Sequence, residues 1–101
     1  MLSHTVFFTL KDSSDAACQT LIDTCHKFLT KHDGISFFGA GRLAAEYDRP
    51  VNDQAFHVAL NVVFESRAAH DVYQVSENHL AFIAASKDNW DQVRVFDADV
   101  N

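Results

Sequence analysis

The side chains that could do chemistry in this 101-residue chain are chiefly six histidines and two tyrosines. A neutral imidazole can accept a proton near pH 7, and a tyrosine hydroxyl can donate a hydrogen bond to a developing oxyanion. His26, His32, His57 and His70 stand in no HxH or HExxH spacing, and no CxxC, GxGxxG, P-loop or GxSxG motif occurs. The sequence therefore predicts neither a metal nor a cofactor. Any catalysis would be acid–base chemistry by side chains.

Cys18 and Cys25 are seven residues apart in one predicted helix, so about 10.5 Å separates their Cα atoms. A disulfide needs a separation below about 7 Å. We therefore expect two reduced, buried thiols and a reducing compartment, with the cytoplasm as the default location.

The composition is that of one globular domain, which we assign to residues 1–101: 48% of the residues are hydrophobic and 22% are charged. Eight Lys+Arg against fourteen Asp+Glu give a net charge of −6 without a basic cluster. This charge argues against nucleic acid and anionic membranes as partners. The apolar runs are too short for a membrane span, and the N-terminus lacks the basic region of a signal peptide.

Hydrophobic periodicity gives the order β-α-β-β-α-α-β. Strands are predicted over residues 4–10, 35–43, 56–64 and 93–96. Helices are predicted over residues 14–32, from Ser66 through Tyr73, and over about 79–88, with Ser76-Glu77-Asn78 breaking the last two apart. Residues 44–55 show no periodicity and form a long loop.

This order predicts a ferredoxin-like α+β sandwich, in which an antiparallel sheet carries helices on one face. The other face would present Phe7, Ala59 and Val63. An uncovered apolar sheet face of this kind is normally an interface. Two subunits packed sheet to sheet would bury it, so we expect a homodimer.

Three segments carry a resemblance to a known family. They are His4-Thr5-Val6-Phe7-Phe8-Thr9-Leu10-Lys11; Phe64-Glu65-Ser66 with Tyr73, His79 and Phe82; and Val95-Phe96-Asp97. In this order and spacing they resemble the first strand, the second-helix region and the last strand of stress-responsive A/B barrel (Dabb) domains. The resemblance implies two ferredoxin-like subunits that form a dimeric α/β barrel, in agreement with the pattern.

The same resemblance implies candidate catalytic residues. The family includes plant stress-associated proteins and a cofactor-free polyketide cyclase, olivetolic acid cyclase. Carried over from that enzyme, the catalytic candidates are Tyr73, His79, His4 and Asp97. His79 would accept a proton, Tyr73 would donate to the enolate, Asp97 would fix the His79 tautomer, and His4 would stand at the pocket mouth. Where many members carry His-Pro-x-His, the chain keeps only the last histidine of that segment.

The predicted site is a pocket inside each subunit, between the sheet and the helices. Strand phase, the helix stripe and the place of a tryptophan in the cyclase give its expected lining: Val6, Phe8, Leu21, Ile22, Val58, Leu60, Val62, Phe82 and Trp90. Such a pocket would bind a small apolar or aromatic, polyketide-like molecule.

Three functions stay open. The first is a homodimeric small-molecule-binding domain, and the second is a cofactor-independent cyclase or related enol-chemistry enzyme using Tyr73 and His79. The third is a purely structural stress protein.

In the structural interpretation His79 caps its helix, Tyr73 anchors the edge of the core, His4 is a half-buried surface residue and Trp90 belongs to the core. A cavity ending at His79 would favour the first two functions, whereas side chains filling that space would favour the third.

Overall fold

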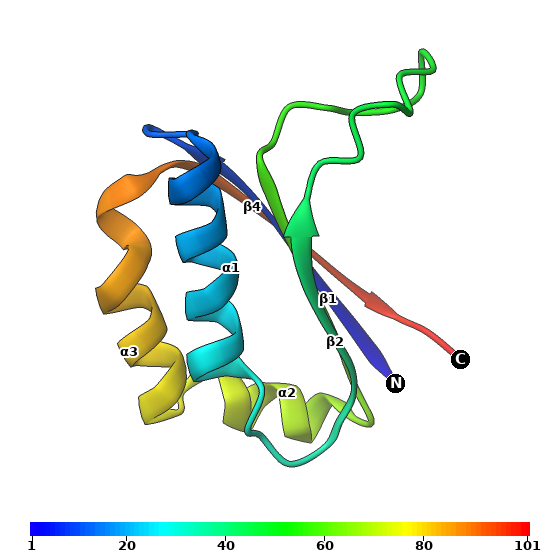
Figure 1. The fold of residues 1–101 in the computed structure, drawn as a ribbon. Helices are drawn as coiled ribbons and strands as arrows, with labels where there is room; N and C mark the ends of the chain where they lie inside the picture. The colour runs from blue at the N-terminus through cyan, green and yellow to red at the C-terminus, as the bar shows by residue number, and fades with distance from the viewer.

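A computed structural model describes all of residues 1–101 as a sheet with helices on one side (Figure 1). The strands are β1 (Leu2–Leu10), β2 (Ile35–Arg42), β3 (Val58–Phe64) and β4 (Trp90–Asp99). The helices are α1 (Asp15–Leu29), α2 (Arg67–Gln74) and α3 (Glu77–Ser86), followed by the 3₁₀ turn η1 (Lys87–Asn89). None of these helices has the length and apolarity needed to cross a bilayer.

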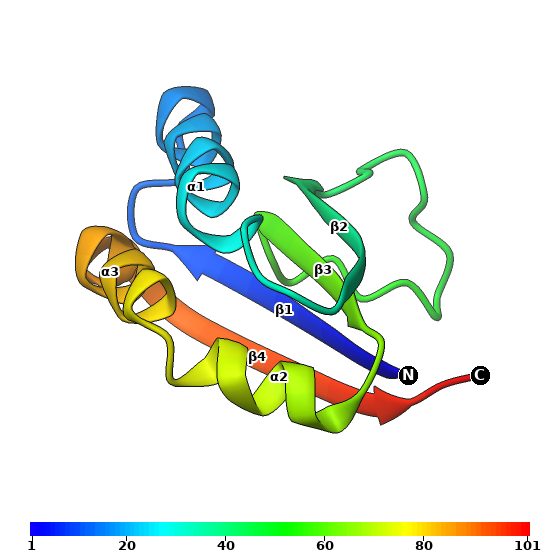
Figure 2. The same ribbon diagram turned by 90° about the horizontal axis from the view of Figure 1, so that it is seen from below.

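The four strands form one sheet in the order β2-β3-β1-β4, and every neighbouring pair is antiparallel. All three helices lie on the same face of this sheet (Figure 2). This arrangement confirms the predicted ferredoxin-like α+β sandwich.

The core forms where the strand and helix periodicities meet. Alternate residues of β1 from Leu2 to Leu10 are buried against the helices, and α1 buries Cys18, Leu21, Cys25 and Leu29. Each large apolar side chain buried in this way stabilises the fold by about 1.5–3 kcal/mol. Both thiols are free and fully buried, as predicted, and burial raises the pKa of Cys25 to about 12.

The last strand and the last helix differ from the prediction. β4 is ten residues long, whereas the predicted strand covers only residues 93–96; Trp90 opens the strand and Asp97 lies within it. The strand extends this far because it pairs with β1 along nearly its whole length, which no local pattern reveals. α3 begins at Glu77, since the Ser76 hydroxyl accepts a hydrogen bond from the His79 backbone N–H. His79 is therefore not a cap; Ser76 is.

The sheet face away from the helices is partly open. Strand register puts Phe7, Ala59 and Val63 on this face, as predicted, together with Phe37 and Phe96. Phe37 and Phe96 are each more than half exposed. We call these five residues the open face.

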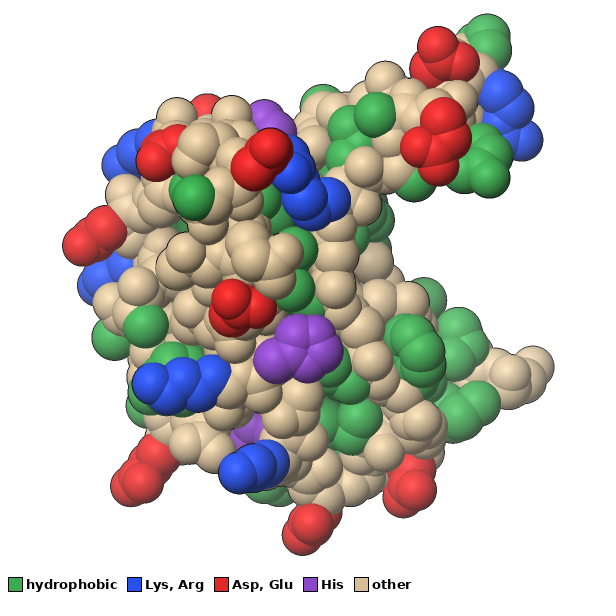
Figure 3. Space-filling model, viewed as in Figure 1, with side chains coloured by type: hydrophobic (Ala, Val, Ile, Leu, Met, Phe, Trp, Pro, Cys, Tyr) green, Lys and Arg blue, Asp and Glu red, His purple; other side chains and the backbone are tan.

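Residues 43–57 project past the open face, and we call this segment the arm (Figures 1 and 3). Its base is fixed: Arg94 pairs with Asp53 at 2.9 Å, and the Thr9 hydroxyl donates to the Ala55 carbonyl at 3.1 Å. Its outer part exposes Tyr47 and Val51. In Figure 3 hydrophobic side chains line the hollow that the arm overhangs.

Candidate functional site

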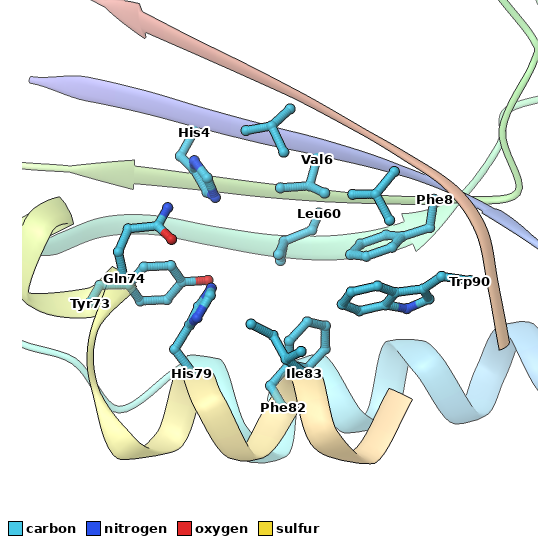
Figure 4. A pocket seen from close by; sticks show the side chains of 12 residues that line it. His4, Val6, Phe8, Leu60, Tyr73, Gln74, His79, Phe82, Ile83 and Trp90 are labelled. Atoms are coloured by element: carbon cyan, nitrogen blue, oxygen red, sulfur yellow. The ribbon is translucent and has the colours of Figure 1, made fainter. Parts of the chain in front are cut away.

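A cavity of about 210 Å³ lies between the sheet and α3 (Figure 4). Its lining residues are His4, Val6, Phe8, Leu60, Tyr73, Gln74, His79, Phe82, Ile83, Trp90, Val93 and Val95. Val95 is half exposed although its register partner Val6 is buried, so the cavity opens to solvent along β4, an edge strand. This volume is below the range typical of pockets for drug-sized ligands, so a guest would be small.

The two ends of the cavity differ in polarity. His4, Tyr73, Gln74 and His79 gather at one end, and aromatic rings close the other (Figure 4). The Phe8 and Trp90 ring centroids are 5.3 Å apart, and those of Phe82 and Trp90 are 5.9 Å apart. These rings pack against one another as a wall and leave the space beside them open.

Part of the predicted lining is wrong. Leu21, Ile22, Val58 and Val62 do not reach the cavity, because α1 covers β2 and β3 while the cavity lies on the β1–β4 side. Leu21, Val58 and Val62 are core residues, and Ile22 packs against that core.

Four residues that were not predicted from the sequence also line the cavity. They are Gln74, Ile83, Val93 and Val95. Val93 and Val95 stand opposite Phe8 and Val6 in the sheet. A longer β4 paired in register with β1 would have predicted both valines.

Tyr73 and His79 face each other at the polar end, with ring centroids 4.9 Å apart and an interplanar angle of 66°. The turn at Val75 and Ser76 brings them together, since α2 ends at Gln74 and the Ser76 cap starts α3 at once. The Tyr73 hydroxyl and His79 Nδ1 are both buried without a hydrogen-bond partner. Buried polar atoms without partners are rare, and here both side chains line a cavity.

Gly34 helps to seat α2, the helix that carries Tyr73. Its φ of +85° is a conformation that favours glycine, and a Cβ there would come within 2.5 Å of the Ala69 Cβ. The turn before β2 can therefore approach α2 closely only with glycine at this position.

Burial shifts the pKa values of both His79 and Tyr73. It lowers the pKa of His79, and the neighbouring imidazoles of His4, His32 and His70 lower it further. It also raises the pKa of the Tyr73 hydroxyl. At neutral pH the cavity thus presents a neutral imidazole and a protonated phenol.

His4 is the third polar group of the cavity, and its partner differs from the prediction. The Asp97 carboxylate lies 2.5 Å from His4 Nδ1, because β1 and β4 pair these residues directly. Asp97 therefore orients His4 rather than His79. His4 is also buried, at 3% exposure, whereas the structural interpretation has it half-buried at the surface.

The His4–Asp97 pair fixes the chemistry that His4 can do. A Nδ1–H that donates to the carboxylate leaves Nε2 as a free acceptor. In Figure 4 the His4 ring points from β1 toward the cavity, near Tyr73 and His79. The polar end can thus accept a proton at one imidazole and donate a hydrogen bond from a phenol, which is what acid–base chemistry on a small molecule requires.

Together, the fold and the site define a ferredoxin-like α+β domain with a polar-ended cavity between sheet and helices. The chain belongs to the stress responsive A/B barrel domain (Dabb) family, whose model matches residues 2–100. This match confirms the resemblance seen in the sequence.

Three solved structures show the same fold. A Dabb family protein with a ferredoxin-like fold from Mesorhizobium loti is 24% identical, with a TM-score of 0.80 over 99% of this chain and 96% of that one. A dimeric ferredoxin-like protein of unknown function from Thermobifida fusca is 13% identical (TM-score 0.78; 98% and 90% covered). The hydroxynitrile lyase of Passiflora edulis is 19% identical (TM-score 0.77; 99% and 93% covered). No curated protein matches the chain in sequence.

Proposed function

We propose that this protein is a homodimeric small-molecule-binding domain. Its ligand would be a small apolar or aromatic, polyketide-like molecule with a hydroxyl or carbonyl group at one end. The apolar body would lie against Phe8, Phe82 and Trp90, and the polar group would meet Tyr73 and His79. The observation that carries this proposal is that the Tyr73 hydroxyl and His79 Nδ1 are both buried without a partner at the polar end of a mainly apolar cavity; the third buried atom without a partner, Trp90 Nε1, belongs to a residue of the aromatic end.

The energetic argument concerns those two atoms. Leaving a buried donor or acceptor unpaired costs about 1–3 kcal/mol, which a core residue without a function would avoid. A ligand oxygen placed between the Tyr73 hydroxyl and His79 Nδ1 would recover part of this free energy. The cavity supports binding over a purely structural role, because Phe8, Phe82 and Trp90 leave its space unfilled.

The homodimer is supported by the open face. Phe37 and Phe96 are exposed there in a protein whose other sheet face is covered by its own helices. A second copy related by twofold symmetry presents the same apolar surface. The Thermobifida fusca protein of the same fold is described as dimeric.

A second candidate is a cofactor-independent, cyclase-like enzyme of enol chemistry using Tyr73 and His79. The His4–Asp97 pair favours this candidate, because a carboxylate-oriented imidazole beside a phenol is suited to removing and returning a proton. In this arrangement His4 would be the proton acceptor, Tyr73 would donate to the developing oxyanion, and His79 would be a neutral second imidazole. A lyase among proteins of this fold is consistent with such chemistry.

Binding can be tested with 4-propylphenol as the probe. We expect saturable binding to the wild-type protein by calorimetry and loss of binding in Ile83→Trp, which fills the cavity. Val75→Trp, on the exposed turn after α2, is the matched control and should bind as wild type does. Circular dichroism checks that both variants fold. Equal binding by folded Ile83→Trp and wild type would contradict the proposal.

A further inference from the structure

Three side chains of the types that bind metal ions, one from each of three elements, meet beside the polar end of the cavity. They are His4 of β1, His70 of α2 and Asp97 of β4, and each offers a ligand atom within 4.8 Å of the other two. We propose that these residues bind a divalent transition-metal ion, Zn²⁺ or a metal of similar preference. This inference goes beyond the proposed ligand cavity, because it assigns a metal ion to three residues of which only His4 also lines the cavity.

The positions of the three side chains are set by the fold. The register of β1 and β4 fixes His4 beside Asp97. His70 lies one turn into α2, where its ring centroid is 5.0 Å from that of His4 and 5.5 Å from that of Phe64. Since α2 is capped by Ser66 and seated against Gly34, the His70 backbone is fixed as well.

The donor set is the one that such metals prefer. Two imidazoles and one carboxylate bind Zn²⁺ at about 2.0–2.2 Å and leave coordination positions open, as catalytic zinc sites do. Neighbouring donors in a tetrahedral site lie roughly 3.3 Å apart by that geometry. His4 and Asp97 are already in contact, and the three donor atoms lie within 4.8 Å of one another.

Each ring nitrogen of His70 has a hydrogen-bonding group beside it. Its Nδ1 is 3.3 Å from the exposed Asp71 carboxylate, and its Nε2 is 3.0 Å from the Gln74 side-chain amide. Whichever nitrogen binds the metal, the other keeps its partner, which is the second-shell arrangement usual for metal-binding histidines.

Charge and access also suit a cation. Asp97 and Asp71 carry negative charge at the cluster, and nearby Arg67 is paired with Asp99. His4 and His70 are nearly buried, but the Asp97 side chain is 42% exposed, so an ion can reach the cluster without unfolding the chain.

The test is a titration of untagged, chelator-treated protein with Co²⁺, followed by its visible absorption bands, and with Zn²⁺ by calorimetry. We expect one ion per chain and a higher melting temperature in its presence. His70→Ala and Asp97→Asn should each weaken binding by more than the 10–100-fold typical of losing a second-shell partner. Circular dichroism checks that both variants fold, since the His70 side chain is only 13% exposed whereas that of Asp97 is 42% exposed. The control His26→Ala removes an exposed histidine of α1 and should bind as wild type does.

Absence of Co²⁺ binding, or equal affinity in His70→Ala and wild type, would overturn the proposal. The 4-propylphenol experiment is repeated in chelator-treated protein, so the two proposals fail separately. Loss of metal binding with intact phenol binding contradicts only the metal site, and the reverse result contradicts only the ligand cavity.

Discussion

His4 and Asp97 are 93 residues apart in sequence, yet their side chains meet at 2.5 Å across the β1–β4 pair. This contact gives one of the cavity's imidazoles a fixed orientation and a fixed tautomer. It also joins the edge strand to the centre of the sheet on the side where the cavity opens.

Asp97→Asn should remove the charge-assisted part of this contact. We expect a loss of about 1 kcal/mol in the free energy of unfolding, at the low end for such bonds because Asp97 is partly exposed. The His4 Nδ1 proton should give a downfield NMR signal in wild type that is lost or shifted upfield in the variant. Absence of this signal in wild type, or an unchanged signal in the variant, would contradict donation of the Nδ1 proton to Asp97.

Tyr73→Phe tests whether the Tyr73 hydroxyl serves ligand binding or the stability of the fold. Because that hydroxyl is buried without a partner, its removal should leave the unfolding free energy unchanged or raise it by up to about 1 kcal/mol. Binding of 4-propylphenol should weaken in the same variant. Tyr47→Phe, in the exposed part of the arm, controls for the substitution itself. Clear destabilisation by Tyr73→Phe would favour the structural interpretation.

Stability should fall as the pH is lowered through the histidine range. The pKa of His79 is lower in the folded protein than the usual value of about 6.5, so the unfolded chain binds the proton more readily. The stabilisation is therefore complete above about pH 6.5 and decreases as the pH falls toward the lowered folded pKa. Urea midpoints between pH 8 and 5 measure this dependence.

His79→Gln should flatten the pH profile, whereas His26→Gln should leave it as in wild type. A His79→Gln profile as steep as that of wild type would assign the pH dependence to other groups.

The homodimer predicts that a charge on the open face separates the subunits. Phe96→Arg should convert a species of twice 11.3 kDa into one of 11.3 kDa in sedimentation velocity at micromolar concentration. Val75→Arg, on the opposite side of the fold, should stay dimeric. A monomeric wild-type protein at that concentration would contradict the proposal.

Features that depend on near neighbours in the chain are predictable from the amino-acid pattern. The alternation from His4 to Leu10 predicted a strand with its inner face against helices, and the stripe through Cys18 and Cys25 predicted the helix that buries both thiols. The resemblance to Dabb domains implied one site for Tyr73 and His79, and their short separation in the chain is consistent with the contact that the structure shows.

Features that depend on strand register, and on how α2 lies against the sheet, are not predictable from that pattern. The partner of Asp97, the Val93 and Val95 wall, and the approach of His70 to His4 all join residues far apart in the chain. A periodic pattern tells which way a side chain faces, but not which distant side chain it meets. That contact is set by the register in which strands pair and by the packing of helices on them.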